Sequence, residues 1–353
     1  MWLLSAYRAD SHAAWSDWLV SRFEHIQWQR LELPGRHFRW RIRGNPLSWL
    51  AQLPADQPDR MIATSMVDLA TLKGLHPRLA QVPVDYYFHE NQFAYPPGEH
   101  QVRSVEPQMV QLYGALAAER LIFNSAFNRD SFIDGVDHLI RRMPDERPRH
   151  VGARLARKSV VCPVPVKPVT QGVERDPRLI VWNHRWEYDK APEVFAAAVR
   201  QLAADGVDFR LALLGPRPRR TPPSLAVLRR ELAARIVADG KVERARYEQL
   251  LGTAGIVVST ALHEFQGLAV LEAASAGARP LVPDALCYPE QYAAAYRYPP
   301  GDGAALRARL AQWLEVALPP PVDVSAWYEQ ALEPAWRQLL PGAGARARVR
   351  PMS

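Results

Sequence analysis

The stretch IVVSTALHEFQGLAVLEAASAGARPLV, residues 256–282, decides the fold. It opens with a short β-branched run at 256–259, which is typical of a buried strand. Leu, Val and Ala then recur at helical spacing across 267–276, and a second apolar run follows at 279–282. A strand, a helix and a strand in this order predict one parallel βαβ unit.

The same alternation continues through the rest of the chain. The second half has predicted strands at 179–182 and 209–214, and predicted helices at 192–202, 225–236 and 247–251. The first half has predicted strands at 2–5, 61–63, 84–88 and 120–123, and predicted helices at 12–23 and 107–118. A proline-rich stretch at 162–177 predicts a linker between the halves, and 326–340 predicts a final amphipathic helix. We therefore expect an α/β protein with two doubly wound sheets and a ligand between them.

Composition excludes several classes of protein. The chain has 353 residues and a net charge of +7, which suits about two globular domains and allows a polyanionic partner. Only five of its 44 Lys and Arg residues are Lys, so the arginine excess first indicates a compositional bias of the genome. Two cysteines cannot build a disulfide framework, and a cytoplasmic protein is expected. No apolar run reaches the roughly 18 residues of a membrane-spanning helix.

Polar residues follow several predicted strands, at the sheet edge where open α/β proteins bind ligands. After the first strand quoted above come His263, Glu264, Gln266 and Gly267. Glycine lets backbone approach a ligand closely, and a helix start offers N–H groups and a positive dipole end to a diphosphate. Glu264 and Glu272 stand eight residues apart, and carboxylates suit the vicinal hydroxyls of a sugar or ribose. The alternative is helix capping by Glu264 and a solvent-exposed Glu272.

Two other strands are followed by candidate residues. Asn183, Arg185 and Lys190 follow the first strand of the second half, and a lysine retained in so Arg-rich a chain favours a point-charge contact with phosphate. The alternative is an ion-paired surface loop. Strand 84–88 is followed by His89 in the run His-Glu-Asn-Gln, for which a ligand site and a capped, solvated loop are equally open. G-x-G-x-x-G, Walker and D-x-D patterns are absent, which disfavours dinucleotide, P-loop and metal-dependent sugar-transfer chemistry.

Six ordered motifs resemble those of the tRNA-queuosine α-mannosyltransferase family, within the retaining glycosyltransferases of family 4. They are YFHENQ, FNSAFNRDSF, RMPDERP, VWNHRWEYDKAPEVF, STALHEFQGLAVLEA and YPE, and they lie in order across residues 87–290. The resemblance implies the GT-B fold, with two Rossmann-like domains facing each other across a cleft. It implies an acceptor side at 1–168, a nucleotide-sugar side at 169–325, and a C-terminal helix at 326–340 that crosses back to the first domain.

The resemblance also implies a reaction: transfer of mannose from GDP-mannose to the cyclopentenediol of queuosine in tRNA, with retention and without a metal or other cofactor. By this resemblance Glu264 holds donor-sugar hydroxyls and Glu272 the ribose. Arg185 and Lys190 neutralise the diphosphate, and His89 lies near the anomeric carbon. The wider donor-binding set is Gly267, Leu268, Gln266, His263, Asn183, Gly215, Ser11 and His12.

The chain departs from the family in its first loop, which is glycine-rich in the family but reads Arg-Ala-Asp-Ser-His at residues 8–12. A different acceptor, such as a lipid-linked or small-molecule glycan, therefore stays open, as does a non-catalytic tRNA-binding relative. A tRNA acceptor requires a basic surface. Its predicted residues are Arg36, Arg39, Arg41 and Arg43, interleaved with His37, Phe38 and Trp40, and Arg141, Arg142, Arg147 and Arg149. The alternative for 36–43 is an amphipathic element with arginine outward.

Overall fold

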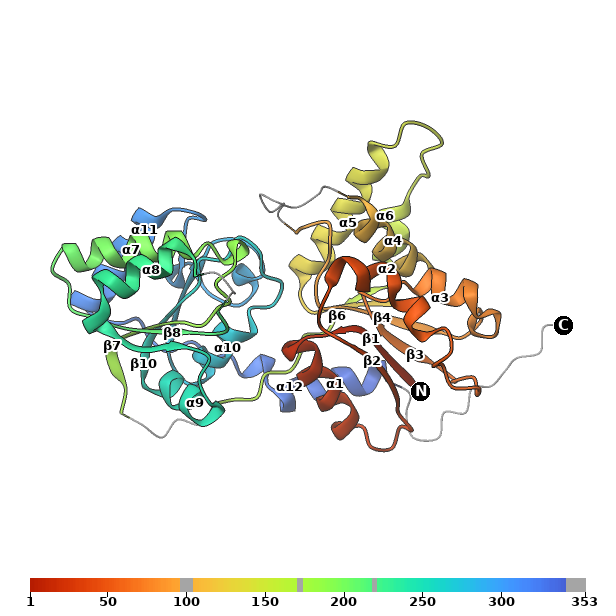
Figure 1. Cartoon of the computed structure of the whole chain (residues 1–353), viewed down its shortest axis with the longest axis horizontal. Coiled ribbons are helices and arrows are strands. Elements are labelled where there is room, and N and C mark those ends of the chain that lie inside the picture. The colour runs from red at the N-terminus through yellow and green to blue at the C-terminus, as the bar shows by residue number, and fades with distance from the viewer. Residues whose placement is uncertain (96–103, 170–173, 218–220, 341–353) are drawn as a thin grey trace. The chain divides into compact units, whose positions relative to one another are not determined.

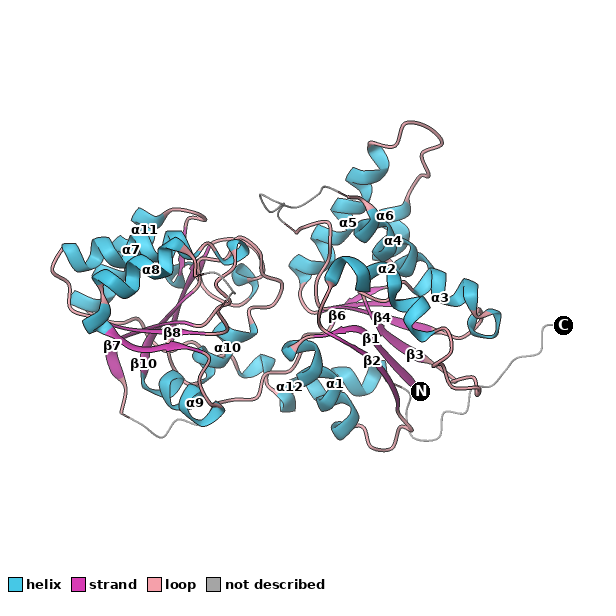
Figure 2. Cartoon of the chain, in the orientation of Figure 1, coloured by secondary structure: helices cyan, strands magenta, loops and turns pink. Residues whose placement is uncertain are grey.

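The computed structural model describes residues 1–95, 104–169, 174–217 and 221–340, which divide into two compact units. The first unit takes residues 1–95 and 104–164 together with the chain from Leu332, and the second takes the described part of 165–331. Each unit holds one six-stranded sheet whose neighbouring strands are all parallel. Helices cover both faces of each sheet (Figure 2), which confirms the α/β, doubly wound class.

The first sheet has the strand order β2-β1-β3-β4-β5-β6 (Figure 1). Its strands are β1 (Trp2–Arg8), β2 (Gln29–Pro34), β3 (Met61–Thr64), β4 (Val84–Phe88), β5 (Arg120–Phe123) and β6 (Ser159–Val161). Its helices are α1 (Asp10–Arg22), α2 (Phe38–Trp49), α3 (Leu69–Leu75), α4 (Glu106–Ala117), α5 (Ala126–Arg141) and α6 (Val151–Ala156). The chain passes from one side of β1 to the other after β2, so the carboxyl ends of β1 and β3 form the topological switch point.

The second sheet has the strand order β12-β11-β10-β7-β8-β9. Its strands are β7 (Asp176–Trp182), β8 (Arg210–Leu214), β9 (Ile236–Gly240), β10 (Ala254–Val258), β11 (Arg279–Pro283) and β12 (Arg297–Tyr298). Its helices are α7 (Pro192–Ala204), α8 (Pro223–Glu231), α9 (Arg244–Thr253), α10 (Leu268–Ser275) and α11 (Gly303–Glu315). The order reverses between β7 and β10, so residues that follow these two strands meet at the switch point.

The apolar pattern predicts the inner strands and misses the outer ones. The four missed strands are β2, β6, β9 and β12, and each is an edge of its sheet. These edge strands are only partly buried; β2, β9 and β12 carry charges and β6 has three residues, so none has the continuous apolar run that marks a central parallel strand. The prediction of a helix at 225–236 is wrong at its C-terminal end, because α8 ends at Glu231 and Ile236 begins the edge strand β9.

The last helix, α12 (Glu329–Leu339), contributes a buried tryptophan to the first unit. Trp336 is fully buried, with its ring centroid 5.9 Å from Trp15 of α1 and 5.3 Å from Tyr87 of β4. Its Nε1 donates to the Pro163 carbonyl at 3.1 Å. A segment more than 150 residues beyond the sheet therefore closes its core from Leu332 onward.

Two of the five lysines in the chain place their ammonium groups on backbone carbonyls of this unit. Lys73 Nζ donates to Val82 at 2.9 Å and to Ala80 at 3.2 Å. Lys158 Nζ donates to Ala118 at 2.5 Å, and burial lowers the pKa of Lys158 to about 8, with Arg154 adding to the effect. An ammonium offers three rotatable donors from one compact atom, a geometry that a planar guanidinium does not reproduce.

Candidate functional site

Buried polar side chains gather in the second unit where β7 and β10 end, around Lys190. The Lys190 Nζ donates to the His263 carbonyl at 2.6 Å and lies 3.3 Å from both Glu264 Oε2 and Asp189 Oδ2. These three contacts match the three donors of an ammonium group. Burial acts to lower the pKa of Lys190, but the Glu264 and Asp189 carboxylates outweigh it and hold that pKa above its ordinary value. Lys190 is therefore a fixed positive charge.

Arg185 and Lys190 both lie near the Asp189 carboxylate, and Lys190 Nζ is 3.3 Å from its Oδ2. The Arg185 guanidinium lies 3.9 Å from Asp189 Oδ2 and 3.0 Å from the Glu187 carboxylate. Its side chain is 51% exposed, whereas that of Lys190 is 9% exposed. Arg185 is thus the cation of this pair that a ligand reaches from solvent.

The partly buried Glu264 is ionised at neutral pH. Burial acts to raise its pKa, but Lys190, His184 and the Gly267 backbone N–H outweigh burial and bring that pKa to about 2. The neighbouring imidazoles stay neutral, because burial, reinforced by Lys190, lowers the pKa of His184 and of His263 to about 4. The site therefore places the ionised Glu264 beside two cations and two neutral imidazoles near pH 7.

Helix α10 begins directly after this carboxylate. Gly267 caps the helix with φ of 68°, and a Cβ there would lie 3.0 Å from the Tyr288 ring. The first-turn N–H groups and the positive dipole end lie at Gly267 and Leu268, as expected for an anion site. The backbone carbonyl of the buried Gln266 accepts a hydrogen bond from Gln291 Nε2 at 2.6 Å.

Glu272 is oriented by helix α9. Tyr247 Oη donates to Glu272 Oε2 at 2.9 Å, and Arg244 donates to Oε1 at 3.2 Å. Asn183, at the end of β7, donates from Nδ2 to Tyr247 Oη at 3.1 Å and to the Ala269 carbonyl at 2.8 Å. One hydrogen-bonded chain therefore links the end of β7, α9 and α10, and leaves Glu272 24% exposed.

Gly215 and three residues outside the expected set complete this site. Gly215 follows β8 with φ of 102°, and a Cβ there would lie 2.5 Å from the His184 carbonyl, so the close passage of two loops requires this glycine. His184 and Asp189 lie in the same loop as Arg185, after the end of β7, so the position after a strand end also predicts them. Tyr247 belongs to another element, and no linear pattern connects it to Glu272.

In the first unit, His12 and His89 stack with ring centroids 4.0 Å apart and an interplanar angle of 16°. The ring centroids of Trp15 and Tyr87 lie 4.8 Å and 4.7 Å from that of His89, both in edge-to-face arrangements. Burial lowers the pKa of His12 to about 4, and burial followed by the proximity of His12 lowers that of His89 well below its ordinary value. His12 Nδ1 and His89 Nε2 are buried and have no hydrogen-bond partner within the described ranges. Two neutral ring nitrogens thus remain available to a ligand.

Other members of the His-Glu-Asn-Gln run shape the loop. Asn91 is fully buried, and its Nδ2 donates to Asn128 Oδ1 at 2.9 Å and to Ser131 Oγ at 3.0 Å. Its Oδ1 accepts the N–H groups of Phe93 and Ala94, both at 3.0 Å. The capped-loop alternative therefore describes Asn91, whereas the imidazole of His89 is set apart from this network.

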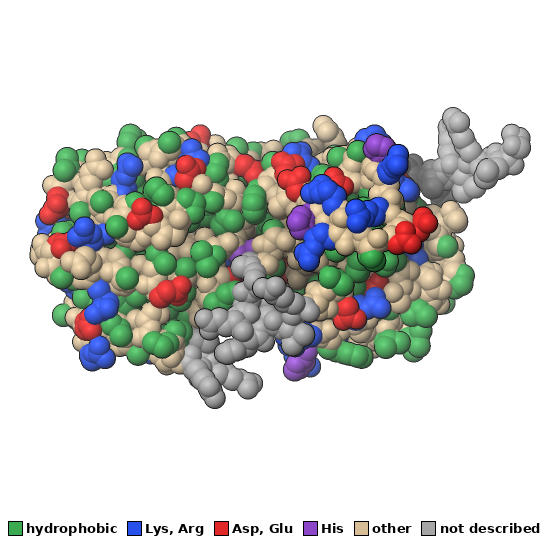
Figure 3. Space-filling model, turned by 90° about the horizontal axis from the view of Figure 1, so that it is seen from above, with side chains coloured by type: hydrophobic (Ala, Val, Ile, Leu, Met, Phe, Trp, Pro, Cys, Tyr) green, Lys and Arg blue, Asp and Glu red, His purple; other side chains and the backbone are tan. Residues whose placement is uncertain are grey.

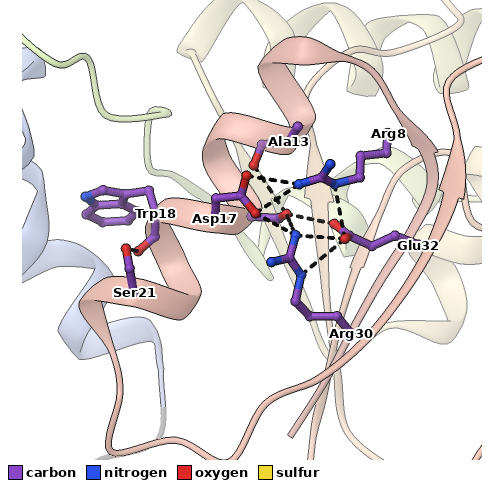
Figure 4. Close-up of polar contacts among 8 residues, drawn as sticks. Arg8, Ala13, Asp17, Trp18, Ser21, Arg30 and Glu32 are labelled. Carbon is purple, nitrogen blue, oxygen red and sulfur yellow. Dashed lines mark hydrogen bonds and ion pairs between the residues drawn. The ribbon is translucent and has the colours of Figure 1, made fainter.

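The expected loop at 8–12 is a single residue, because β1 ends at Arg8 and α1 begins at Asp10. The Arg8 guanidinium is ion-paired within the unit (Figure 4). It lies 2.9 Å from the Asp17 carboxylate and 3.1 Å from that of Glu32, and Arg30 pairs with the same two carboxylates. His12 is buried under the first turn of α1, whereas Ser11 is exposed there.

Residues 36–43 lie at the start of α2. Ile42 is buried while Arg36, Arg39 and Arg43 are exposed, so the arrangement with arginine outward is the one observed. Trp40 is 55% exposed on the same surface.

The described helices include none long and apolar enough to cross a membrane. Among the same residues, no three His, Cys, Asp or Glu side chains are grouped to hold a metal ion. The two cysteines, Cys162 and Cys287, are both buried and unpaired.

Replacing Lys190 with Met should destabilise the second unit by about 3–5 kcal/mol, because Glu264 and Asp189 would remain as buried carboxylates without their shared cation. The double variant Lys190→Met/Glu264→Gln should regain part of that loss. Chemical denaturation of the three proteins measures the difference, and equal stability of the single and double variants would contradict the ion-pair account.

The buried imidazole of His12 predicts acid destabilisation between pH 6.5 and pH 4. An unfolded histidine takes up its proton near pH 6.5, whereas His12 does so near pH 4 in the folded protein, so the unfolded state binds more protons in this window. The free energy of unfolding should fall by up to about 3 kcal/mol as the pH drops through it. Denaturation curves of His12→Gln should show a shallower fall, while exposed His138→Gln keeps the wild-type profile; parallel curves for all three proteins would refute the assignment.

Comparison with known proteins identifies the family. Residues 1–166 match the family described as tRNA-queuosine alpha-mannosyltransferase N-terminal, and residues 177–316 match glycosyl transferases group 1. A tRNA-queuosine alpha-mannosyltransferase of Drosophila melanogaster is 33% identical over 304 residues, which cover 82% of this chain and 81% of that protein.

Solved structures share the fold at low identity. Anabaena HepE in complex with UDP and glucose superposes with a TM-score of 0.59 at 15% identity, over 89% of each chain. The lipopolysaccharide outer core galactosyltransferase WaaB superposes with a TM-score of 0.62 at 12% identity, over 96% of this chain and 98% of that one. The fold is thus GT-B, with two Rossmann-like domains. The chain is a glycosyltransferase and belongs to the tRNA-queuosine α-mannosyltransferase family.

Proposed function

We propose that this protein transfers mannose from GDP-mannose to the cyclopentenediol of queuosine in tRNA, with retention at the anomeric carbon. The name of the Drosophila relative supports the sugar and the acceptor, and the motif resemblance supports the guanosine donor. The structural observation that carries the proposal is the ionised Glu264, fixed by Lys190 beside the start of α10. A carboxylate and a helix N-terminus side by side suit a sugar linked to a diphosphate.

The donor half of the reaction uses the charges of the second unit. Glu264 accepts hydrogen bonds from donor-sugar hydroxyls, and Glu272, oriented by Tyr247, accepts from the ribose. Arg185 and the backbone N–H groups at the start of α10 stabilise the negative charge that grows on the leaving diphosphate. Lys190 contributes its positive charge, while its N–H donors hold Glu264 and the loop of His263 in place.

The remaining donor-site residues form the wall of the same pocket in this proposal. Asn183, His263, Gln266 and Gly215 hold the loops against which the donor lies. The Leu268 backbone N–H faces the phosphates, while that of Gly267 bonds Glu264.

The acceptor half of the reaction uses the stacked imidazoles. Neutral His89 and His12 offer ring nitrogens that bond acceptor or donor hydroxyls without adding charge beside the anomeric carbon. Retention proceeds by attack on the face that the leaving phosphate occupies, with the phosphate taking the acceptor proton, so no side chain serves as a nucleophile.

The proposed reaction needs no metal ion, since Arg185, Lys190 and the α10 N-terminus supply positive charge to the leaving group. We place it in the cytoplasm, because the two cysteines are unpaired and suit a reducing compartment.

The test is incubation of queuosine-containing and queuosine-lacking tRNA with a panel of nucleotide sugars, followed by mass analysis of the nucleosides. We expect the queuosine nucleoside alone to gain one hexose, most rapidly with GDP-mannose, and an added chelator to leave the rate unchanged. Absence of a gain on any queuosine nucleoside would refute the acceptor. A gain on a lipid-linked or small-molecule glycan in a parallel panel would identify the alternative acceptor.

The two carboxylates should have separable roles in that assay. Glu264→Gln should lower kcat by about 10²–10³-fold, because its charge acts on the reacting sugar. Glu272→Gln should instead raise the KM for the donor by roughly tenfold or more, because a hydrogen bond to a charged group is weakened. Glu193→Gln, on the exposed surface of α7, is the matched control. Glutamine is preferred to alanine because it keeps the volume beside Lys190, and wild-type kinetics in Glu264→Gln would remove it from the site.

A further inference from the structure

Six arginines gather on the hairpin made by α5, the connection 142–150 and α6, which we name the arginine hairpin. They are Arg141, Arg142, Arg147, Arg149, Arg154 and Arg157, and all are exposed. Residues 138–158 carry seven Lys and Arg against two Asp and Glu, an excess of five in a chain whose net charge is +7. Figure 3 shows Lys and Arg side chains gathered on this face of the first unit.

These arginines have no carboxylate partners among the described residues, a property that they share with a few scattered exposed arginines such as Arg36, Arg39 and Arg246. Within the described ranges, no Asp or Glu oxygen lies within 4.0 Å of any of the six. By contrast, exposed arginines such as Arg178, Arg200 and Arg230 are each ion-paired. A compositional bias toward arginine explains scattered arginines, but not six clustered between residues 141 and 157 without neutralising partners.

The backbone of the hairpin is held in a defined shape. Glu146 and His150 adopt φ of 45° and 61°, in the left-handed region that non-glycine residues rarely occupy. The Gly152 N–H donates to Asp137 Oδ1 at 3.1 Å, and a Cβ at Gly152 would lie 2.4 Å from that carboxylate. Arg147 Nε donates to the Met143 carbonyl at 2.6 Å. Strained backbone of this kind persists where the surroundings enforce it, which points to a function for the shape.

We propose that the arginine hairpin binds the phosphate backbone of the acceptor RNA, an inference that rests on the proposed function. The guanidinium fork matches phosphate oxygens in geometry and charge. An anionic membrane would need apolar side chains to insert beside the cations. The large exposed hydrophobic residues of the described chain include none between 138 and 157, and Val105, which lines a hollow with Arg141 and Arg142, is one small side chain, so the surface suits RNA.

The hairpin is placed to hold the RNA away from the nucleoside that reacts. Helix α5 begins after β5, beside His89, whose carbonyl accepts from Asn124 Nδ2 at 2.8 Å. Its 16 residues span roughly 24 Å, and the arginines follow at the far end. Contacts at that distance position the backbone and carry no base information, so tRNA with and without queuosine should bind the hairpin equally.

The test compares Arg142→Ala/Arg149→Ala with the control Arg178→Ala/Arg230→Ala, which removes the same charge from ion-paired sites. The hairpin variant should bind tRNA about tenfold more weakly, and its log Kd against log salt should lose about one unit of slope per arginine. Its KM for tRNA should rise while its KM for the donor stays unchanged. The control should match the wild type.

Three outcomes decide the inference. Equal tRNA affinity in the hairpin variant and the control would overturn it. Binding of vesicles that contain phosphatidylserine by the wild type, lost in the hairpin variant, would overturn the choice of RNA in favour of a membrane. If the wild type transfers no hexose to tRNA but the hairpin variant alone still loses tRNA affinity, the proposed function fails and the RNA surface stands.

Discussion

One buried ammonium group organises the second unit. Lys190 lies at the sheet's switch point, where loops from β7 and β10 would otherwise be two independent surface segments. Its side chain donates to the His263 carbonyl and to Glu264. Two further hydrogen bonds join the loops through the backbone: Thr260 Oγ1 donates to the Lys190 carbonyl at 2.7 Å, and the Leu262 N–H donates to the Asp189 carbonyl at 2.8 Å. The cation also makes a partly buried, ionised carboxylate tolerable. Loop geometry and carboxylate charge depend on it, and it reinforces the burial that keeps the neighbouring histidines neutral.

In the first unit, side-chain packing sets the charge state of the candidate site residues. His12 and His89 are kept neutral by burial beneath aromatic rings, and the rings of Trp15 and Tyr87 are themselves packed against Trp336. The histidines therefore depend on a helix near the C-terminal end of the chain. Removal of that helix would hydrate the imidazoles and raise their pKa values toward ordinary ones, so the protonation state of this site is a property of the whole unit.

The sequence predicts those parts of this protein that depend on uninterrupted apolar runs or on strand ends. The apolar pattern predicts inner strands such as β4 and β10, because both of their faces are buried. It does not predict the edge strands, which have a neighbouring strand on one side only. Strand ends led to Lys190 and Glu264. Contacts between separate elements are not predicted: Tyr247 bonds Glu272 from another helix, and the close approach of Gly215 to the His184 carbonyl joins two loops. Such contacts are set by the fold and leave no periodic trace.

The few lysines of the chain now have a structural explanation. Three of the five, Lys73, Lys158 and Lys190, direct one nitrogen at two or more converging oxygens inside the fold. A planar guanidinium spreads its donors over a wider fork and does not fill these places. Arginine at any of these three positions would place a larger, planar group where the oxygens converge on one point. In a chain with so few lysines, these three mark where positive charge has to be compact.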